Sequence, residues 1–376
     1  MIARRALAQC VCIVALAFAT AVFAHKSSDA YLTILRTDRD LVVRFDAALR
    51  DLELAIGLDA NGDGDITWGE VRGRHAAIAA LALERLKLTV DGRRCPLSLR
   101  GHRVDTHTDG AYAVIDLAGR CETSGPLAID YRLLFDVDPQ HRGLISITDG
   151  ATTQSLVLSA DRPTANVGDG GLVAQFVSYL REGSLHIFNG LDHLLFIVAL
   201  LLPAVLVRRQ GTWLAADRFR NVAWGVLGVI TAFTLAHALT LTLAALGVLR
   251  VPSRVAESLV ALSIVVTALN NLRPTVERAR WGIAFAFGLV HGLGFANVLA
   301  GLNLPGNVLL VALVAFNLGV ELGQIVVAAV LLPIAFMLRD TVVYRRVVLV
   351  GGSILVALLG LAWFVERAFG VPVFTR

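Results

Sequence analysis

Six long apolar segments fill the second half of this 376-residue chain and constrain its fold more than any other feature. They run roughly over residues 185–207, 222–246, 254–272, 281–301, 306–337 and 345–366. Each is long enough to cross a bilayer, whose hydrocarbon core takes about 20 apolar residues. Only 17% of the sequence is charged, against about 25% in an average soluble domain. We therefore predict that residues 181–376 form an all-α membrane domain, a bundle of six transmembrane helices.

The first 24 residues have the pattern of an export signal. Arg4 and Arg5 precede a short apolar run that ends in Val22-Phe23-Ala24, with small residues where a signal peptidase reads. We predict a cleaved signal peptide over 1–24; the alternative is a first membrane helix. Cleavage leaves two cysteines, Cys95 and Cys121, which we expect to form a disulfide in an oxidising compartment.

Residues 25–180 differ in charge and pattern from the rest. They carry 17 Lys and Arg against 22 Asp and Glu, whereas residues 181–376 carry 15 against 8. Short β-type runs separated by Gly, Asp and Pro predict a small, β-rich, sandwich-like exported domain with one helical insertion. The expected strands cover residues 31–35, 41–47, 86–90, 111–117, 127–135, 144–148 and 155–158.

The insertion contains a twelve-residue stretch, 59–70, that fits an EF-hand loop position by position. The ligand positions are taken by Asp59, Asn61, Asp63, Asp65 through its carbonyl, Thr67 and Glu70. Gly64 stands at the sharp turn and Ile66 at the apolar eighth position. Residues 52–58 and 71–86 can form the flanking helices. We expect calcium as a cofactor, bound by a single hand with a structural role; an Asp- and Gly-rich surface turn is the alternative.

Arginines set the expected orientation. The loops at 208–221, 273–280 and 338–346 carry ten arginines, and the alternate loops and tail carry four. The positive-inside rule then places the arginine-rich loops in the cytoplasm. We predict a multi-pass protein of the bacterial inner membrane, with the N-terminal domain and the C-terminus periplasmic. The basic residues lie in short loops, so the expected partners include the lipid bilayer and no nucleic acid.

Polar side chains inside the apolar segments predict a shared site, because unpaired charges in lipid are costly. His186, Asn189 and His193 fall at i, i+3 and i+7 of one predicted helix, which puts them on one face. The other candidates form a ladder running inward from the outer surface: Asp192, His237 and His291, with Glu257, Asn317 and Glu321 as supporting residues. Imidazole and carboxylate together suit nickel, cobalt or zinc. A proton relay is the alternative.

Three motifs in this half carry a family resemblance: HIFNGLDHLLFI, FTLAHALTL and VHGLGFA, which begin at His186, Phe233 and Val290. Together they resemble the HupE/UreJ family of hydrogenase and urease accessory membrane proteins, in the branch with an exported N-terminal domain. The resemblance implies uptake of a divalent metal ion, nickel or cobalt, for metalloenzyme maturation. It points to His186, Asp192, His193, His237 and His291 as the metal site, and to the maturation machinery as a partner.

Three functions remain open on the residues alone. The first is a nickel or cobalt permease, which is not an enzyme; without an ATP-binding motif it has no ATPase of its own. The second is a membrane-embedded metal-dependent hydrolase, since His and Asp can also hold a catalytic zinc. The third is an envelope sensor or scaffold with a calcium-binding domain.

Overall fold

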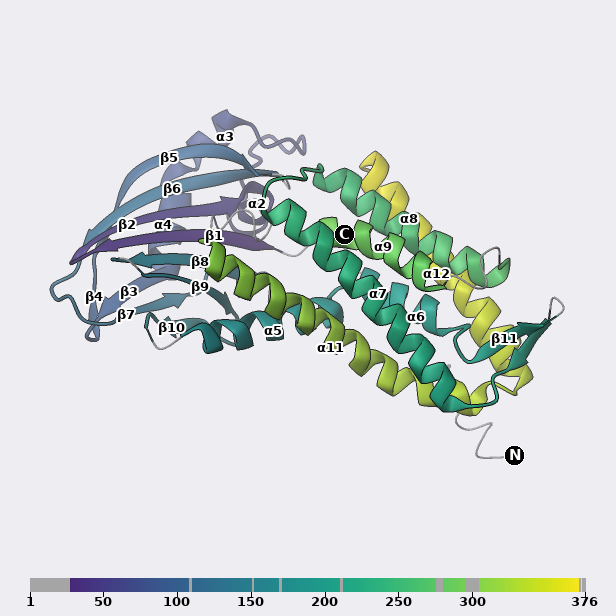
Figure 1. The fold of residues 1–376 in the computed structure, drawn as a ribbon. Coiled ribbons are helices and arrows are strands. Elements are labelled where there is room, and N and C mark those ends of the chain that lie inside the picture. Colours follow the sequence, from purple (N-terminus) through teal and green to yellow (C-terminus); the bar gives the residue numbers. More distant parts are fainter. Residues whose placement is uncertain are drawn as a thin grey trace.

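A computed structural model describes residues 28–107, 110–150, 152–168, 171–209, 212–274, 280–294, 304–371 and 373. It contains a β-rich part near the N-terminus and a helical part that follows it, set end to end (Figure 1). The signal peptide predicted over 1–24 lies outside the described residues.

The β-rich part is built from two sheets. The larger has the order β5-β6-β2-β1-β8-β9 and the smaller the order β10-β7-β3-β4. The strands of the larger sheet are β1 (Asp29–Thr37), β2 (Asp40–Ala48), β5 (Leu97–His107), β6 (Gly110–Arg120), β8 (Arg142–Asp149) and β9 (Thr152–Ser159). Those of the smaller are β3 (Leu86–Val90), β4 (Arg93–Arg94), β7 (Leu127–Tyr131) and β10 (Thr164–Asn166). Alternate side chains of β1 and β2, such as Ile34, Val43 and Phe45, are buried in one core with residues of the smaller sheet.

The expected strands recur in the structure, but β7 is shorter than predicted, and three further strands of the β-rich part, β4, β5 and β10, lie outside the predicted runs. β7 ends at Tyr131 instead of reaching Phe135, because residues 133–137 form a turn in which Leu134 has a φ of +57°. The long strand β5 had not been predicted. Its two arginines are exposed and its two histidines half-buried, so it lacks the apolar alternation by which a buried strand is recognised.

The helical insertion follows β2. Helix α2 (Leu49–Ile56) comes before the 59–70 loop, and α3 (Trp68–Gly73) and α4 (His75–Arg85) come after it. The single helix predicted over 71–86 is wrong in one respect, since it is interrupted at Arg74. Thr67 and Glu70 close the start of α3 with a reciprocal capping box, which holds this helix against the loop.

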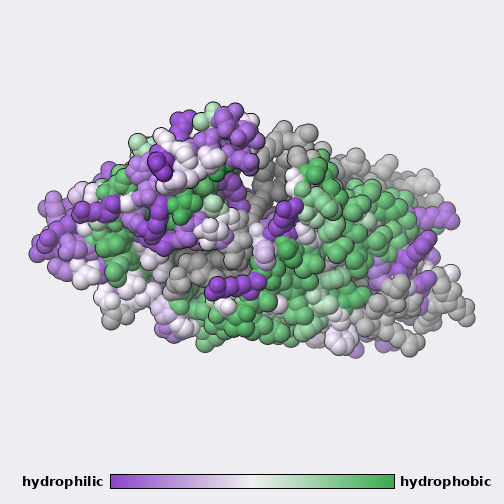
Figure 2. Space-filling model, turned by 90° about the horizontal axis from the view of Figure 1, so that it is seen from above, coloured by the Kyte–Doolittle hydropathy of each residue, from purple (hydrophilic) through white to green (hydrophobic). Residues whose placement is uncertain are grey.

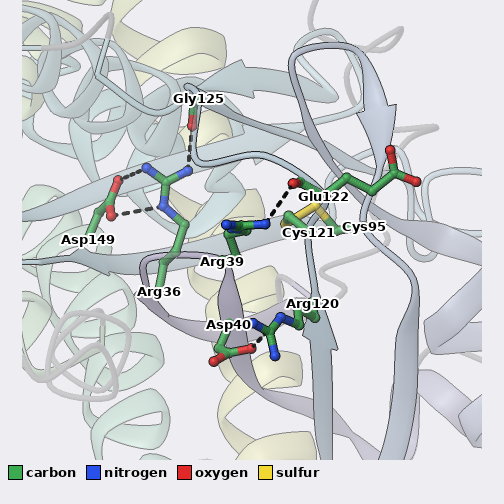
Figure 3. The surroundings of a disulfide bond; sticks show 9 residues. All are labelled: Arg36, Arg39, Asp40, Cys95, Arg120, Cys121, Glu122, Gly125 and Asp149. Atoms are coloured by element: carbon green, nitrogen blue, oxygen red, sulfur yellow. Dashed lines mark hydrogen bonds and ion pairs between the residues drawn. A yellow bond between two sulfur atoms is a disulfide. The ribbon is translucent and has the colours of Figure 1, made fainter.

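A disulfide joins Cys95, which precedes β5, to Cys121, which follows β6 (Figure 3). Both residues are buried, and their Cα atoms are 4.6 Å apart. Nearby, the Arg36 guanidinium is held by both carboxylate oxygens of Asp149 and donates to the Gly125 carbonyl at 2.7 Å. The cross-link and this ion pair tie the turns at one end of the two sheets together.

The helical part comprises α5 (Leu172–Asn189), α6 (Leu191–Leu201), α7 (Phe219–Ala245), α8 (Ser253–Leu272), α9 (Arg280–Gly294), α11 (Gly306–Leu338), the π-helix η2 (Tyr344–Gly351) and α12 (Gly352–Phe369). Within the described residues, four spans are long and apolar enough to cross a membrane: α7, α8, α11 and the continuous pair η2–α12. The pair α5–α6 adds a fifth when it is taken as one span. In Figure 2 hydrophobic residues cover the surface of this part broadly, while the β-rich part is mainly hydrophilic.

One of the six predicted segments differs from the structure, and another is described only in part. The first, 185–207, is not one helix: the chain bends by 72° between α5 and α6, and α6 ends at Leu201. Pro203 follows, and a hairpin of β11 (Leu206–Arg209) and β12 (Thr212–Ala215) then takes the place of the end of the segment. The fourth, 281–301, is described as α9 only to Gly294, and its predicted end lies outside the described residues.

The two parts meet at the start of the helical part. Tyr31 and Tyr112 of the larger sheet belong to the same apolar cluster as Tyr179 and Ile187 of α5. The hydroxyl groups of Ser155 and Tyr179 are hydrogen-bonded at 2.5 Å. Arg142 also donates to Glu182, and Arg181 pairs with Asp161. The β-rich part is therefore anchored to α5, the helix that leads directly into the first histidine motif.

A buried hydrogen-bond chain fixes the start of β1. The Tyr131 hydroxyl lies 2.6 Å from His141 Nε2, Ser28 Oγ lies 2.5 Å from His141 Nδ1, and Ser28 donates to Asp51 at 2.8 Å. Because the Ser28 proton goes to Asp51, Nδ1 of His141 donates to Ser28 and Nε2 accepts from Tyr131. A neutral His141 satisfies every partner in this chain, so protonating it would break the chain.

We expect acid to destabilise this region through His141. Burial, with a smaller contribution from Arg142, lowers its pKa from 6.5 to about 3. Below pH 6.5 the unfolded chain binds a proton at His141 that the folded state does not bind. His141 therefore gives its full contribution to the free energy of unfolding above pH 6.5. This contribution falls between pH 6.5 and pH 3, by up to about 1.4 kcal/mol per pH unit. Burial raises the pKa of Asp51, which opposes part of this loss. Hydrogen exchange of β1 and β8 amides measured between pH 7 and 4 checks the effect.

The matched variant is His141→Gln, which has no group titrating in that range. Its free energy of opening should be lower at pH 7 but should depend much less on pH. An equal pH dependence in both proteins would contradict the role of His141.

Candidate metal centre

The bend between α5 and α6 creates the centre of the helical part. A Cβ on Gly190 would lie 2.8 Å from the His186 carbonyl and 2.8 Å from His193 Nδ1, so only glycine fits there. His186 lies in the last turn of α5 and His193 in the first turn of α6, so the prediction that they share one helix face is wrong. The bend nevertheless brings their rings to a centroid distance of 4.5 Å.

Three histidines from three helices converge at this bend. The ligand atoms of His186, His193 and His237 all lie within 4.8 Å of one another. His291 of α9 joins them, with its ring 5.0 Å from that of His193. His193, His237 and His291 are buried. The predicted ladder of histidines at successive depths is thus one compact cluster.

Two of the rings are oriented by polar partners. Nδ1 of His193 lies 3.0 Å from Asp192 Oδ1, and Nδ1 of His237 lies 3.0 Å from Asn317 Oδ1. The Asn317 amide nitrogen donates to the Leu313 carbonyl at 2.8 Å, which turns its oxygen toward the ring. Both imidazoles therefore donate from Nδ1 and keep the lone pair on Nε2.

His291 is also oriented by a polar partner, but here the roles of the two ring nitrogens are exchanged. Its Nε2 lies 2.9 Å from Ser263 Oγ, and the Ser263 hydroxyl proton is donated to the Val260 carbonyl at 2.7 Å. Nε2 therefore donates and Nδ1 keeps the lone pair. The buried atoms Nε2 of His193, Nε2 of His237 and Nδ1 of His291 have no hydrogen-bond partner in the described structure. A buried nitrogen lone pair whose ring is fixed from the other side is the usual arrangement of a histidine metal ligand.

Glycines allow the helices to come close enough for this cluster. A Cβ on Gly288 would collide with the Phe233 carbonyl, and one on Gly292 would lie 2.5 Å from the His237 carbonyl. Helix α9 thus packs directly on the backbone of α7, which brings His291 near His237. Gly183 and Gly319 do the same for α5 and α11, which carry His186 and Asn317.

The remaining predicted residues lie around the cluster or away from it. Asp192 orients His193 and pairs with Arg367 at 3.7 Å. Glu321 accepts a hydrogen bond from Thr231 at 2.7 Å, and the Glu257 carbonyl accepts one from Arg367. Asn189 is exposed at the end of α5. None of these four belongs to the group of converging ligand atoms.

Sequence reasoning missed two polar residues that set up the site. Ser263 orients His291, and Arg367 neutralises Asp192 from the far end of α12. A serine within an apolar helix carries no distinct pattern. Arg367 is one of the four arginines of the alternate loops and tail, which the sequence analysis uses only for the orientation of the helices.

Three phenylalanine rings, Phe196, Phe233 and Phe316, also pack on the histidines, at centroid distances of 4.8–6.4 Å.

The 59–70 loop folds back on itself. Asp59 accepts from the amides of Gly62 and Gly64, and Asp63 accepts from Asp65 N. The Glu70 carboxylate, at the twelfth position, reaches the Ala60 amide at 3.0 Å. Hydrogen bonds from the Thr67 backbone and hydroxyl lower the pKa of Glu70, so it is ionised at neutral pH. Gly64 has a φ of +87°, as the sharp turn requires.

Among the described residues, the three histidines are the one group of three or more His, Cys, Asp or Glu whose ligand atoms converge within 4.8 Å. The carboxylates of the 59–70 loop do not form such a group. Three neutral imidazoles suit a borderline transition metal such as nickel, cobalt or zinc, whereas calcium takes oxygen ligands only. The donor set of the helical cluster therefore fits a transition-metal ion.

Comparison with known proteins agrees with the motifs. The HupE / UreJ protein family profile matches residues 163–367, more than half of the chain, from the last strand of the sandwich to Arg367. None of the curated proteins matches the chain. The chain is thus a membrane protein of an accessory and permease-like class that handles metal ions. It belongs to the HupE/UreJ family, and the resemblance seen in the three motifs is confirmed.

Asn317 provides a test of the orientation of His237. Replacing it with Leu removes the oxygen that fixes the ring, and such losses typically weaken metal binding about 10- to 100-fold. Asn317→Asp keeps an acceptor oxygen in place and is the matched control. Cobalt binding to the purified full chain, followed by visible absorption, should weaken in the first variant and stay much closer to wild type in the second. Equal affinities in Asn317→Leu and wild type would contradict this role.

Proposed function

We propose that this protein is a permease that moves a divalent transition-metal cation, nickel or cobalt, through the histidine cluster. One observation carries the proposal: three imidazole ligand atoms from three helices lie within 4.8 Å of one another, inside an apolar bundle. Membership of an accessory and transport-type family supports it and favours a transporter over an enzyme. The cargo would serve the maturation of a metalloenzyme, with its maturation machinery as a partner.

The residues have distinct tasks in this proposal. His186, His193 and His237 bind the cation, and His291 lies next to them as a further ligand on its path. Asp192, Asn317 and Ser263 hold the rings in the tautomers that present lone pairs. Only neutral imidazole binds metal, so a proton and a cation compete for the same nitrogen. Arg367 balances the charge of Asp192, so that this carboxylate orients a ring instead of trapping the cation.

The proposed setting is the inner membrane of a bacterium. Residues 1–24 would direct export, so that the sandwich and the C-terminus are periplasmic. The six spans predicted from the sequence require that the pair α5–α6 and the predicted segment 281–301 each cross, alongside α7, α8, α11 and η2–α12. The arginines of the β11–β12 hairpin and of the loops at 273–280 and 338–346 favour this orientation.

We also propose that the 59–70 loop binds calcium and stabilises the sandwich. Five of its six predicted ligand residues offer side-chain oxygens, and Asp65 offers its carbonyl, which is the ligand type that calcium prefers. The helices on both sides of the loop and the ionised Glu70 support this assignment.

Metal uptake tests the permease. We expect His193→Ala and His237→Ala to reduce nickel and cobalt uptake into proteoliposomes by at least about 100-fold, because each removes one of three ligands. The matched control is His75→Ala, a histidine of the sandwich that lies far from the cluster in the chain. All variants are first compared for membrane insertion and for a single peak in gel filtration. Wild-type uptake by well-folded His193→Ala and His237→Ala would refute the permease.

Calcium binding has its own test. Glu70→Gln should weaken calcium binding to the full chain by about 10-fold or more, because the bidentate carboxylate becomes a neutral amide. Calorimetry measures the affinity, and Glu84→Gln, on the exposed side of α4, is the control. The idea fails if both variants bind calcium as the wild type does, or if the wild type binds none.

A further inference from the structure

A large cavity lies beside the histidine cluster and plays no part in the proposed permease mechanism. Its volume is about 1770 Å³, and helices α7, α8 and α9 line it together with the β11–β12 hairpin. A cavity of this size is far larger than a dehydrated metal ion needs.

The walls of the cavity are apolar and open toward the side of the bundle. Trp224 and Leu235 of α7, Leu269 of α8 and Trp281 of α9 all line it, and each is at least half exposed. These residues belong to helices whose outer faces would contact lipid. The cavity is therefore a groove in the lateral surface, which acyl chains can enter without crossing a polar region.

Glycines form part of the floor of this groove. Gly225 and Gly228 of α7 both line it, and a Cβ built on either would meet no atom within 4 Å. They differ in this from Gly288 and Gly292, where the neighbouring helix fills the space. Glycine at these two positions leaves room along α7 that no side chain of the described protein occupies.

One end of the groove is strongly basic. Arg208, Arg218, Arg273 and Arg280 line it there, and Asp217 is the one acidic residue among the described residues of the lining. Arg208 and Arg280 donate to the carbonyls of Pro274 and Pro203, each at 3.3 Å, which fixes their positions at the mouth. Arg218 and Arg273 are exposed. Such a cluster repels a free metal cation and attracts a phosphate group.

We propose that this groove binds an anionic phospholipid. The acyl chain lies along Gly225 and Gly228 between α7 and α8, and the phosphate meets the four arginines at the level of the hairpin. Apolar walls that end in a basic pocket are the pattern of a binding site for an anionic lipid headgroup between membrane helices. The assignment is independent of the metal carried, and of whether any metal is carried.

The lipid would also reach the neighbourhood of the histidines. Phe233 lines the groove on one side, and its ring lies 5.2 Å from that of His291 and 6.1 Å from that of His237 on the other. An acyl chain in the groove therefore packs against the aromatic layer that separates it from the cluster.

Lipid titration tests the proposal. Delipidated full-length protein in detergent is titrated with dioleoylphosphatidylglycerol or dioleoylphosphatidylcholine, and bound lipid is counted by native mass spectrometry. The two lipids share their chains, so the difference reports the headgroup charge. Each of the two exposed arginines should favour the anionic lipid about fivefold, so we expect the wild type to prefer it by about 25-fold.

Three variants separate the parts of the site. Arg218→Gln/Arg273→Gln should lose the preference. Gly228→Leu, at a position where an added Cβ meets no atom within 4 Å, should fill part of the groove and weaken binding of both lipids. Arg345→Gln/Arg346→Gln, in η2 outside the groove, should keep the wild-type preference. Equal binding of both lipids to the wild type, wild-type binding by Gly228→Leu, or an equal loss in the control would each overturn the proposal.

Discussion

The centre of the helical part depends on the close contact at Gly190. Any side chain there would strike the His186 carbonyl in the last turn of α5 and the His193 ring in the first turn of α6. The resulting 72° bend turns one apolar segment into two short helices, and places His186 and His193 on opposite sides of a corner. The glycines of α9 and α11 then bring His237, His291 and Asn317 toward the same corner. Backbone contact, more than side-chain packing, therefore determines where the imidazoles meet.

The polar groups inside the bundle are arranged in pairs. Each of His193, His237 and His291 has one nitrogen bonded to a partner, and that partner is itself held by a second bond or ion pair. In a low-dielectric interior such chains hold the rings rigidly, because breaking any bond leaves a polar atom unsatisfied. The same principle operates in the sandwich, where Tyr131, His141, Ser28 and Asp51 form a chain that fixes the start of β1.

The sequence predicted the elements better than it predicted their geometry. Local patterns predicted several elements correctly. These patterns are the alternation of apolar residues in β1 and β2, and the length of the apolar runs at α7, α8 and α11. The bend at Gly190 could not be inferred in the same way, since an isolated glycine in an apolar run is often tolerated within a helix. The ladder of depths failed for this reason: it treated 185–207 as a straight span. Ser263 and Arg367 act through tertiary contacts, which one sequence does not reveal.

The fixed tautomers have a consequence for energetics. Imidazole binds a metal ion in its neutral form, so the three converging histidines add no charge to a bound cation, and Arg367 offsets the carboxylate of Asp192 beside them. A divalent cation held there keeps its full charge, because the site supplies none to cancel it. Its passage would therefore be electrogenic, and an inside-negative membrane potential would contribute about 4.6 kcal/mol per 100 mV to a twofold charge. A bundle of this kind could concentrate its cargo on one side of the membrane at the expense of the potential alone, without hydrolysing a nucleotide.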